Sequence, residues 1–163
     1  MQAVSDATPL IHLSKISKVS YLKKLFDAIF IPKEIFEEIV SKGKVHKEVA
    51  FIEKLIEEEF VNVKEVHSSI NMPNLHIGEL KAMALCKELK IKNLLIDEKE
   101  GYEAALILGL KPLRTTSLLL RMLNRKMIKF NGYKDALIGL SESGYFLSAE
   151  TYERLLEAGR KGR

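Results

Sequence analysis

The sequence predicts an α/β fold in which helices cover both faces of a central, mainly parallel sheet. Short apolar segments with strand character alternate with longer segments of helical periodicity, and this alternation is typical of a parallel sheet. The chain has 163 residues, 47% of them hydrophobic, which suits one domain with a substantial core. We expect that domain to occupy residues 1–140, with a C-terminal helical appendage over residues 141–163 packed on it.

The first half of the chain contains three expected strands. Thr8 followed by Pro9 is a favourable start for a helix directly after the first strand. Pro32 ends the second strand, and the third shows the alternation of a half-buried strand. In chain order the expected elements are strand 2–6 and its helix, strand 28–31, helices 33–41 and 46–59, and strand 60–66.

The second half of the chain repeats the alternation after a loop rich in Ser, Asn and Pro over residues 67–75. Gly109 stands where a left-handed residue commonly ends a helix, and Ser148 is a suitable N-cap for the last helix. In chain order the expected elements are helix 77–90, strand 93–97, helix 99–108, strand 111–114, and helices 115–124, 133–140 and 149–158.

The composition excludes several classes of protein and site. No apolar stretch approaches the ~20 residues of a membrane-spanning helix, and the N-terminus has no basic segment typical of a secretory signal, so we expect a cytoplasmic protein. The single cysteine, Cys86, excludes an internal disulfide and a multi-cysteine zinc site. Phosphate-binding glycine loops and nucleophile-elbow serine motifs are missing. Abundant Lys and Glu with a single Gln is a thermophile-like composition.

Positive charge is concentrated in one segment. The net charge is +4, and residues 111–134 contain seven Lys or Arg and no acidic residue. Such a one-sided basic segment indicates a phosphate-backbone partner, although an ordinary solvated helix face would show the same pattern. The candidate contacts to an RNA backbone are Arg114, Arg121, Arg125 and Lys126.

Two of the four aspartates follow short apolar strands. Asp6 ends the first strand and Asp97 ends the strand over residues 93–97, each just before a helix. If these strands are neighbours, both carboxylates lie outside the carboxyl ends of the strands, where open α/β sheets bind ligands. Paired carboxylates suit a hard divalent cation such as Mg²⁺ or Mn²⁺. The alternative is that each aspartate makes only a local turn.

Glu79 is an acidic residue on a mostly apolar helix face. At about 100° per residue, it lies on the side of Ala82 and Cys86, in the first turn of its helix. A buried carboxylate is costly unless it is compensated; a helix N-terminus contributes about 0.3–1 kcal/mol, and a metal would contribute far more. A role in capping alone is the alternative. In an earlier helix, Glu37 and Glu38 lie about equally far from the apolar centre, so helical geometry does not choose between them.

Several segments stand in a characteristic order along the chain: VSDATPLIHLSKI, IPKEIFEEIVSKG, HIGELKAMALCKEL, LLIDEKEGYEAALILGLKP and RTTSLLLRML. Together they resemble the PIN-domain family, and most of all the short prokaryotic PIN-like proteins related to VapC-type toxin ribonucleases. The tail SESGYFLSAETYERLLEAG is similar to the ending of that subfamily. The resemblance runs from about Val4 to the C-terminus, and it implies a three-layer α/β/α fold that cuts RNA with metal held by acidic residues.

The resemblance also implies roles for individual residues. The catalytic acidic residues would be Asp6, Glu38 (with Glu37 still possible), Glu79 and Asp97, with Mg²⁺ or Mn²⁺ held by Asp6, Glu79 and Asp97. Glu38 rests on the resemblance alone, and the auxiliary positions would be Thr8, Glu98 and Thr115. Arg114 stands where close relatives often have glycine, so it would either narrow the cleft or add a phosphate contact.

The function implied is that of a metal-dependent ribonuclease, the toxin of a toxin–antitoxin pair. Its partners would be RNA and a cognate antitoxin, and its assembly a homodimer. The alternative is a non-cleaving PIN-fold module that binds RNA or protein. A DNA-directed flap-type nuclease is disfavoured, because such enzymes carry more acidic ligands and longer helical insertions than this chain can hold.

Overall fold

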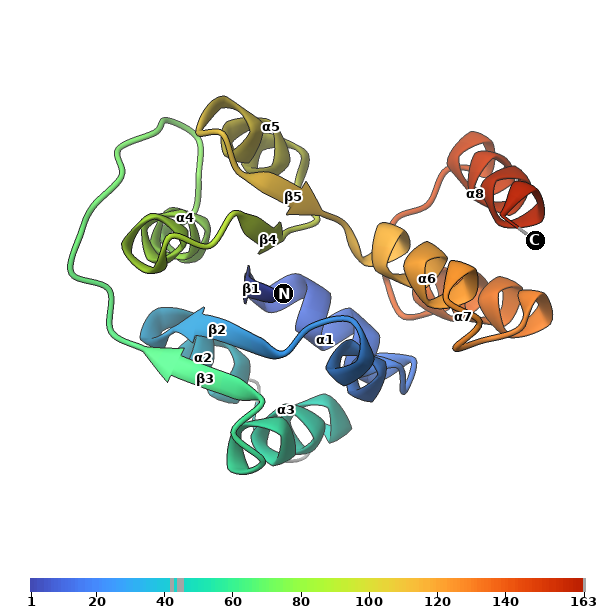
Figure 1. Ribbon diagram of the computed structural model, residues 1–163, viewed down its shortest axis with the longest axis horizontal. Coiled ribbons are helices and arrows are strands. Elements are labelled where there is room, and N and C mark those ends of the chain that lie inside the picture. The colour runs from blue at the N-terminus through green and yellow to red at the C-terminus, as the bar shows by residue number, and fades with distance from the viewer. Residues whose placement is uncertain (42, 44–45, 163) are drawn as a thin grey trace.

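The computed structural model describes residues 1–41, 43 and 46–162. Within these residues five strands form one parallel sheet in the order β3-β2-β1-β4-β5 (Figure 1). The strands are β1 (Gln2–Ser5), β2 (Ala28–Pro32), β3 (Val61–Lys64), β4 (Asn93–Leu95) and β5 (Lys111–Leu113). The parallel sheet is the one that the sequence predicts.

Helices alternate with these strands and then complete the chain. They are α1 (Ala7–Lys15), the 3-10 helix η1 (Val19–Lys24), α2 (Lys33–Ser41), α3 (Lys47–Glu57), α4 (Ile77–Leu89), α5 (Lys99–Ile107), α6 (Thr115–Asn124), α7 (Phe130–Glu142) and α8 (Ala149–Lys161). The long connection between β3 and α4 runs around the outside of the molecule (Figure 1). None of the helices in the described part of the chain is long and apolar enough to cross a membrane.

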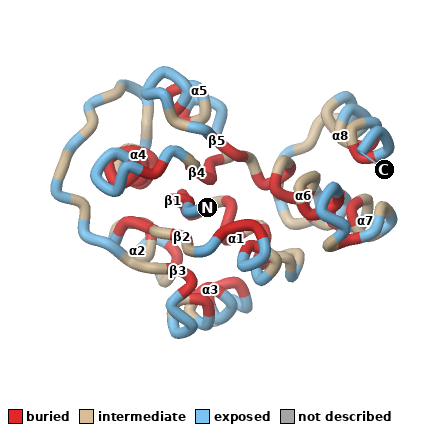
Figure 2. The backbone as a smooth tube through the Cα atoms, in the orientation of Figure 1, coloured by how far each residue is buried: buried red, intermediate tan, exposed pale blue. Residues whose placement is uncertain are grey.

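The sheet separates two hydrophobic cores, which gives the three-layer α/β/α arrangement. Ala3 and Leu95 face a core that includes residues of α1, α3 and α6, whereas Val4 and Leu94 face a second core with residues of α4 and α5. Successive strand residues point to opposite faces, so a central parallel strand must be apolar on both sides. Figure 2 accordingly shows buried residues in β1 and β4 and along parts of α1, α4 and α6.

Several element boundaries differ from the expected ones. β3 ends at Lys64, the residue that pairs with Pro32 at the end of β2, because β2 gives way to α2 there and leaves nothing for a longer β3 to pair with. α7 begins at Phe130 rather than 133 and extends to Glu142, and η1 was not expected. Gly109 follows α5 with a φ of +74°, and Ser148 accepts a hydrogen bond from the Thr151 backbone N–H at 3.1 Å as the N-cap of α8, both as predicted.

The C-terminal helices pack on the rest of the fold. α8 contacts α6 and α7, and its inner side buries Leu156 and Gly159. α7 spans residue 140, the expected boundary between the domain and the C-terminal appendage. The division of the chain at that residue stays a prediction. The last residue of the expected appendage, Arg163, lies outside the described residues. The connection between α7 and α8, residues 143–148, passes close to the carboxyl ends of the strands, where it contacts Asp97, two residues after the end of β4.

Candidate active site

The carboxyl ends of β1 and β4 meet at the point where the strand order reverses. The chain runs outward from β1 to β2 and β3, then returns to place β4 on the other side of β1. Ser5 pairs with Leu95, and the Asp6 backbone N–H donates to the Leu95 carbonyl at 2.9 Å. In open α/β sheets this switch point is where ligands bind. Asp6 and Asp97 therefore lie at the same end of adjacent strands.

Asp6, and not Thr8, is the N-cap of α1, which corrects the expected helix start. Its backbone is extended, with φ −73° and ψ 168°, but its side chain makes no capping hydrogen bond. The carboxylate lies instead among other carboxylates, and only 6% of the residue is exposed. Thr8 is the second residue of α1 and lines a neighbouring cleft.

Gly78 shows how near Asp6 and Glu38 approach each other. A Cβ atom placed on Gly78 would lie 3.5 Å from Asp6 Oδ1, 3.5 Å from Glu38 Oε2 and 3.2 Å from Ile35 Cδ1. The carboxylates of Asp6 and Glu38 thus border the same small space at the start of α4. Glu37 is exposed, and it is Glu38 whose charge acts on Asp6.

Glu79 is buried at the start of α4, with 3% of its surface exposed. Its Oε2 accepts a hydrogen bond from the His76 backbone N–H at 2.9 Å, which is the capping role foreseen as the alternative. Its Oε1 is buried and has no hydrogen-bond partner. That oxygen lies against Gly101 of α5, where an added Cβ would stand only 2.6 Å away. Glycine at this position therefore leaves room for the carboxylate.

Asp97 is held by hydrogen bonds from two directions. Thr115 donates its backbone N–H to Oδ1 at 2.8 Å and its hydroxyl to Oδ2 at 2.7 Å. The hydroxyl of Tyr145, from the α7–α8 connection, donates to Oδ1 at 2.7 Å. Thr115, which the sequence suggested as an auxiliary residue, is fully buried and acts here on the carboxylate itself. Glu98 follows as the exposed N-cap of α5.

The electrostatics of Asp6 report the convergence of all four acidic residues. Burial raises the pKa of Asp6 from 3.8 to about 7; the backbone N–H of Ala7 opposes the rise, and the charges of Glu38, Glu79 and Asp97 add to it. Each of these charges disfavours ionisation of a neighbour. Burial, followed by the charge of Asp97, likewise raises the pKa of the Tyr145 hydroxyl, while the charge of Arg114 opposes that rise. Three other segments of the chain thus place carboxylates around Asp6.

These carboxylates fit a divalent cation by their chemistry. A buried carboxylate oxygen without a partner, such as Glu79 Oε1, is costly unless a cation or donor compensates it. Oxygen ligands of this kind suit Mg²⁺ or Mn²⁺. Within the described ranges, however, no three His, Cys, Asp or Glu side chains are arranged to hold a metal ion as they stand. Cation binding would require the side chains to move, and the exposed Glu38 has the freedom to do so.

A cleft of about 440 Å³ opens beside Asp97. Its walls come from α1, from the residues that follow β4 and β5, and from the α7–α8 connection; we call it the Asp97 cleft. It contains two cationic side chains, Lys99 and Arg114. The guanidinium carbon of Arg114 lies 4.6 Å from the centre of the Tyr102 ring, a cation–π distance. Arg114 therefore adds a fixed cation to the cleft.

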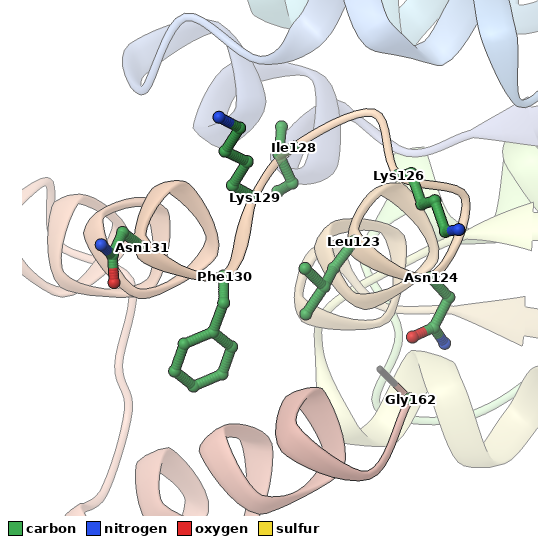
Figure 3. Close-up of a pocket in the computed structure, with 8 residues that line it drawn as sticks. All are labelled: Leu123, Asn124, Lys126, Ile128, Lys129, Phe130, Asn131 and Gly162. Carbon is green, nitrogen blue, oxygen red and sulfur yellow. The ribbon is translucent and has the colours of Figure 1, made fainter.

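The remaining basic candidates lie elsewhere. Arg114 precedes α6, whereas the last turn of the helix and the residues after it contain Arg121, Arg125 and Lys126. Because the ten residues of α6 span about 15 Å, these three side chains lie away from Arg114. Arg125 donates to the Lys24 carbonyl at 3.3 Å. Lys126 borders a larger hollow of about 670 Å³ between the end of α6, the start of α7 and the end of α8 (Figure 3). Among the described residues no carboxylate lines that hollow, so we place the candidate chemistry at the acidic cluster instead.

Two positions of the site were not foreseen. Tyr145 lies in the expected appendage, in the tail that resembles the ending of the PIN-like subfamily, and nothing in its local pattern indicates that it reaches Asp97, 48 residues earlier. Gly101 stands in a helix that the sequence predicts, but its contact with Glu79 joins two different helices. The only local signal is the unusual placement of a glycine inside a helix, which is unfavourable without a packing reason.

Comparison with known proteins identifies the family. A family model described as PIN domain matches residues 2–160, which is nearly the whole chain. No curated protein matches the sequence. The chain therefore belongs to the PIN-domain family and has a fold of the nuclease type, as the sequence resemblance indicated.

Proposed function

From this family membership and the acidic cluster, we propose that the protein is a metal-dependent ribonuclease that hydrolyses RNA phosphodiester bonds. The observation that carries the proposal is the convergence of Asp6, Glu38, Glu79 and Asp97 at the switch point of the sheet. A structural role does not require four carboxylates to meet, because their mutual repulsion destabilises the folded state. A site that holds a cation beside a phosphate accounts for it, because carboxylate oxygens are ligands for such an ion.

Asp6, Glu79 and Asp97 would hold Mg²⁺ or Mn²⁺, with Glu38 binding directly or through water. The chemistry supplied by such an ion is a more acidic water and neutralisation of charge on the scissile phosphate. Thr115 and Tyr145 hold the Asp97 carboxylate in one orientation. Arg114 would contact the substrate phosphates from the Asp97 cleft.

The biological role that we propose is that of a toxin in a toxin–antitoxin pair, acting in the cytoplasm as a homodimer and blocked by a cognate antitoxin. This part of the proposal rests on the resemblance to VapC-type proteins. Coexpression with the protein encoded beside it tests the role: growth arrest that the neighbour relieves would support it. Growth unaffected by an active nuclease would contradict it.

The nuclease proposal is tested by metal-dependent cleavage. Wild type, Asp97→Asn and Asp135→Asn would be incubated with single-stranded RNA and DNA in Mg²⁺, Mn²⁺ or EDTA. Asp135 is an exposed residue of α7 outside the acidic cluster, so its variant is a matched control. We expect RNA cleavage by wild type and Asp135→Asn in metal only, and none by Asp97→Asn. Equal cleavage by all three proteins would point to a contaminant and contradict the assignment.

A non-cleaving RNA- or protein-binding module is the second candidate. The observation that favours it is that the described carboxylates do not already form a metal site. A folded wild type that binds single-stranded RNA in the same assay, yet cleaves nothing with either metal, would favour this candidate over the nuclease.

A further inference from the structure

Phe146 is an aromatic side chain left in solvent at the rim of the Asp97 cleft. Its exposed fraction is 88%, the highest of any large hydrophobic residue in the described part of the chain. It lines the same cleft as Asp97 and Arg114. A single exposed apolar residue is common on protein surfaces, so the location and setting of this one decide its meaning.

The backbone that carries Phe146 is anchored on both sides. Tyr145 before it donates its hydroxyl to Asp97 and packs edge-on against the His12 ring, with 5.1 Å between ring centres. Leu147 after it packs against the main hydrophobic core, and Ser148 caps α8. Phe146 is therefore held outward between two inward-pointing neighbours at a defined distance along the chain from the Asp97 contact. The orientation does not result from a loose loop end.

The cleft beside this ring is suited to phosphate groups. Lys99 and Arg114 line it together with the carboxylates of Asp97 and Glu98. Among the described residues Arg114 forms no ion pair with a carboxylate, and its guanidinium contacts the Tyr102 ring. A phosphate chain is attracted by such cations. An exposed aromatic ring next to cationic side chains is the combination by which proteins bind single strands, with bases stacked on the ring and phosphates against the cations.

We propose that Phe146 is a stacking platform for one nucleobase of a single-stranded nucleic acid whose backbone lies in the Asp97 cleft. The inference rests on the proposed nuclease function and adds how the substrate is held beside the acidic cluster. A duplex would not use this platform, because its bases present their faces to one another inside the stack. The ring would thus select unpaired substrate and fix its position relative to Asp97.

The test measures binding separately from cleavage. Fluorescence anisotropy would follow a labelled 12-nucleotide single-stranded oligouridylate and a duplex RNA of equal length, in the Asp6→Asn background with Mg²⁺. Base stacking on an aromatic ring is worth roughly a 5- to 150-fold change in Kd. We expect Phe146→Ala to weaken single-strand binding by a factor in this range and to leave the weaker duplex binding unchanged. Phe51→Ala, at an exposed phenylalanine of α3 outside the cleft, is the matched control and is expected to have no effect.

Two further variants distinguish stacking from general apolar contact. Phe146→Trp should bind the single strand as well as wild type, whereas Phe146→Leu should behave like the alanine variant. A single abasic nucleotide would be placed at each position of the oligonucleotide in turn. For the protein that retains Phe146, it should weaken binding at the one position whose base stacks on the ring. At that same position it should have no further effect on Phe146→Ala, because the two changes remove one interaction.

Other results would overturn the proposal. If the protein that retains Phe146 shows no detectable single-strand binding, or if all substitutions of Phe146 leave binding equal, the ring holds no base. A Phe146→Ala protein with unchanged RNA binding but weakened self-association in sedimentation experiments would make the ring a protein contact. If the stacking results hold while wild type cleaves nothing, the ribonuclease assignment fails and the binding platform stands. If wild type cleaves but Phe146 has no influence, only the platform fails.

Discussion

Replacing Asp6 by Asn should stabilise the metal-free protein above neutral pH. Asp6 is buried among other carboxylates, and its pKa rises from 3.8 to about 7. The folded state therefore holds a proton between these pH values that the unfolded state has lost, so the free energy of unfolding falls as the pH rises through this interval. The difference of about three pH units corresponds to about 4 kcal/mol at 1.36 kcal/mol each. Asparagine has a similar shape and no charge, so its contribution does not change with pH.

The assay is urea denaturation in EDTA at intervals from pH 4 to pH 8.5 for both proteins. We expect the two free energies of unfolding to be closest near pH 4 and to diverge by up to about 4 kcal/mol by pH 8, with the Asn variant more stable. Adding Mg²⁺ at pH 8 should stabilise wild type far more than the variant, because ligand binding to the folded state raises stability by mass action. Parallel pH profiles for the two proteins would refute the reasoning, since Asp6 would then have an ordinary pKa.

Three further substitutions test the site with a matched control for two of them. Gly101→Ala should reduce nuclease activity and stability, because the new Cβ would stand 2.6 Å from the buried Glu79 Oε1. Gly132, like Gly101, is the third residue of its helix, but a Cβ there would be 3.9 Å from its nearest neighbour. Gly132→Ala should therefore be neutral or slightly stabilising in thermal denaturation. Tyr145→Phe should lower kcat/KM about tenfold, because it removes one hydrogen bond to the Asp97 carboxyl group. Tyr133→Phe loses only a hydrogen bond to a backbone carbonyl and should affect stability alone. Equal kcat/KM for the two variants would contradict the positioning role of Tyr145. Arg114→Gln should weaken single-strand binding and reduce the slope of log K against log salt by about 0.7, and an unchanged slope would show that no phosphate contacts this side chain.

The order and type of the main elements could be predicted because they depend on local patterns. The short segment before Asp6, centred on Ala3 and Val4, and the compact apolar segment before Asp97 indicate buried strands whichever strands they pair with. Burial of Glu79 was likewise predictable, since its side of the helix carries apolar residues. The chain's membership in the PIN-domain family could also be recognised from the sequence. The resemblance depends on short motifs in a set order along the chain, and recognising them requires no knowledge of contacts between elements.

Tertiary contacts decided what local patterns leave open. Helical periodicity places Glu37 and Glu38 equally, and only the packing of α2 against the start of α4 brings Glu38 to Asp6. Thr8 has the chemistry of an N-cap, yet Asp6 holds that position with its side chain turned to the acidic cluster. The basic residues of the 111–134 segment appear as one group in the sequence, but the length of α6 separates Arg114 from Lys126.

By itself, then, the sequence determined a parallel α/β sheet with acidic residues at the ends of its strands, because hydrophobic periodicity and strand-ending residues act over a few positions along the chain. Only the tertiary structure determined that Tyr145 binds Asp97 and that Gly101 makes room for Glu79. Those contacts join segments that are distant in sequence, and their geometry depends on how whole layers pack. The physical reason is that a carboxylate's neighbours, and with them its pKa and orientation, are set by packing between elements.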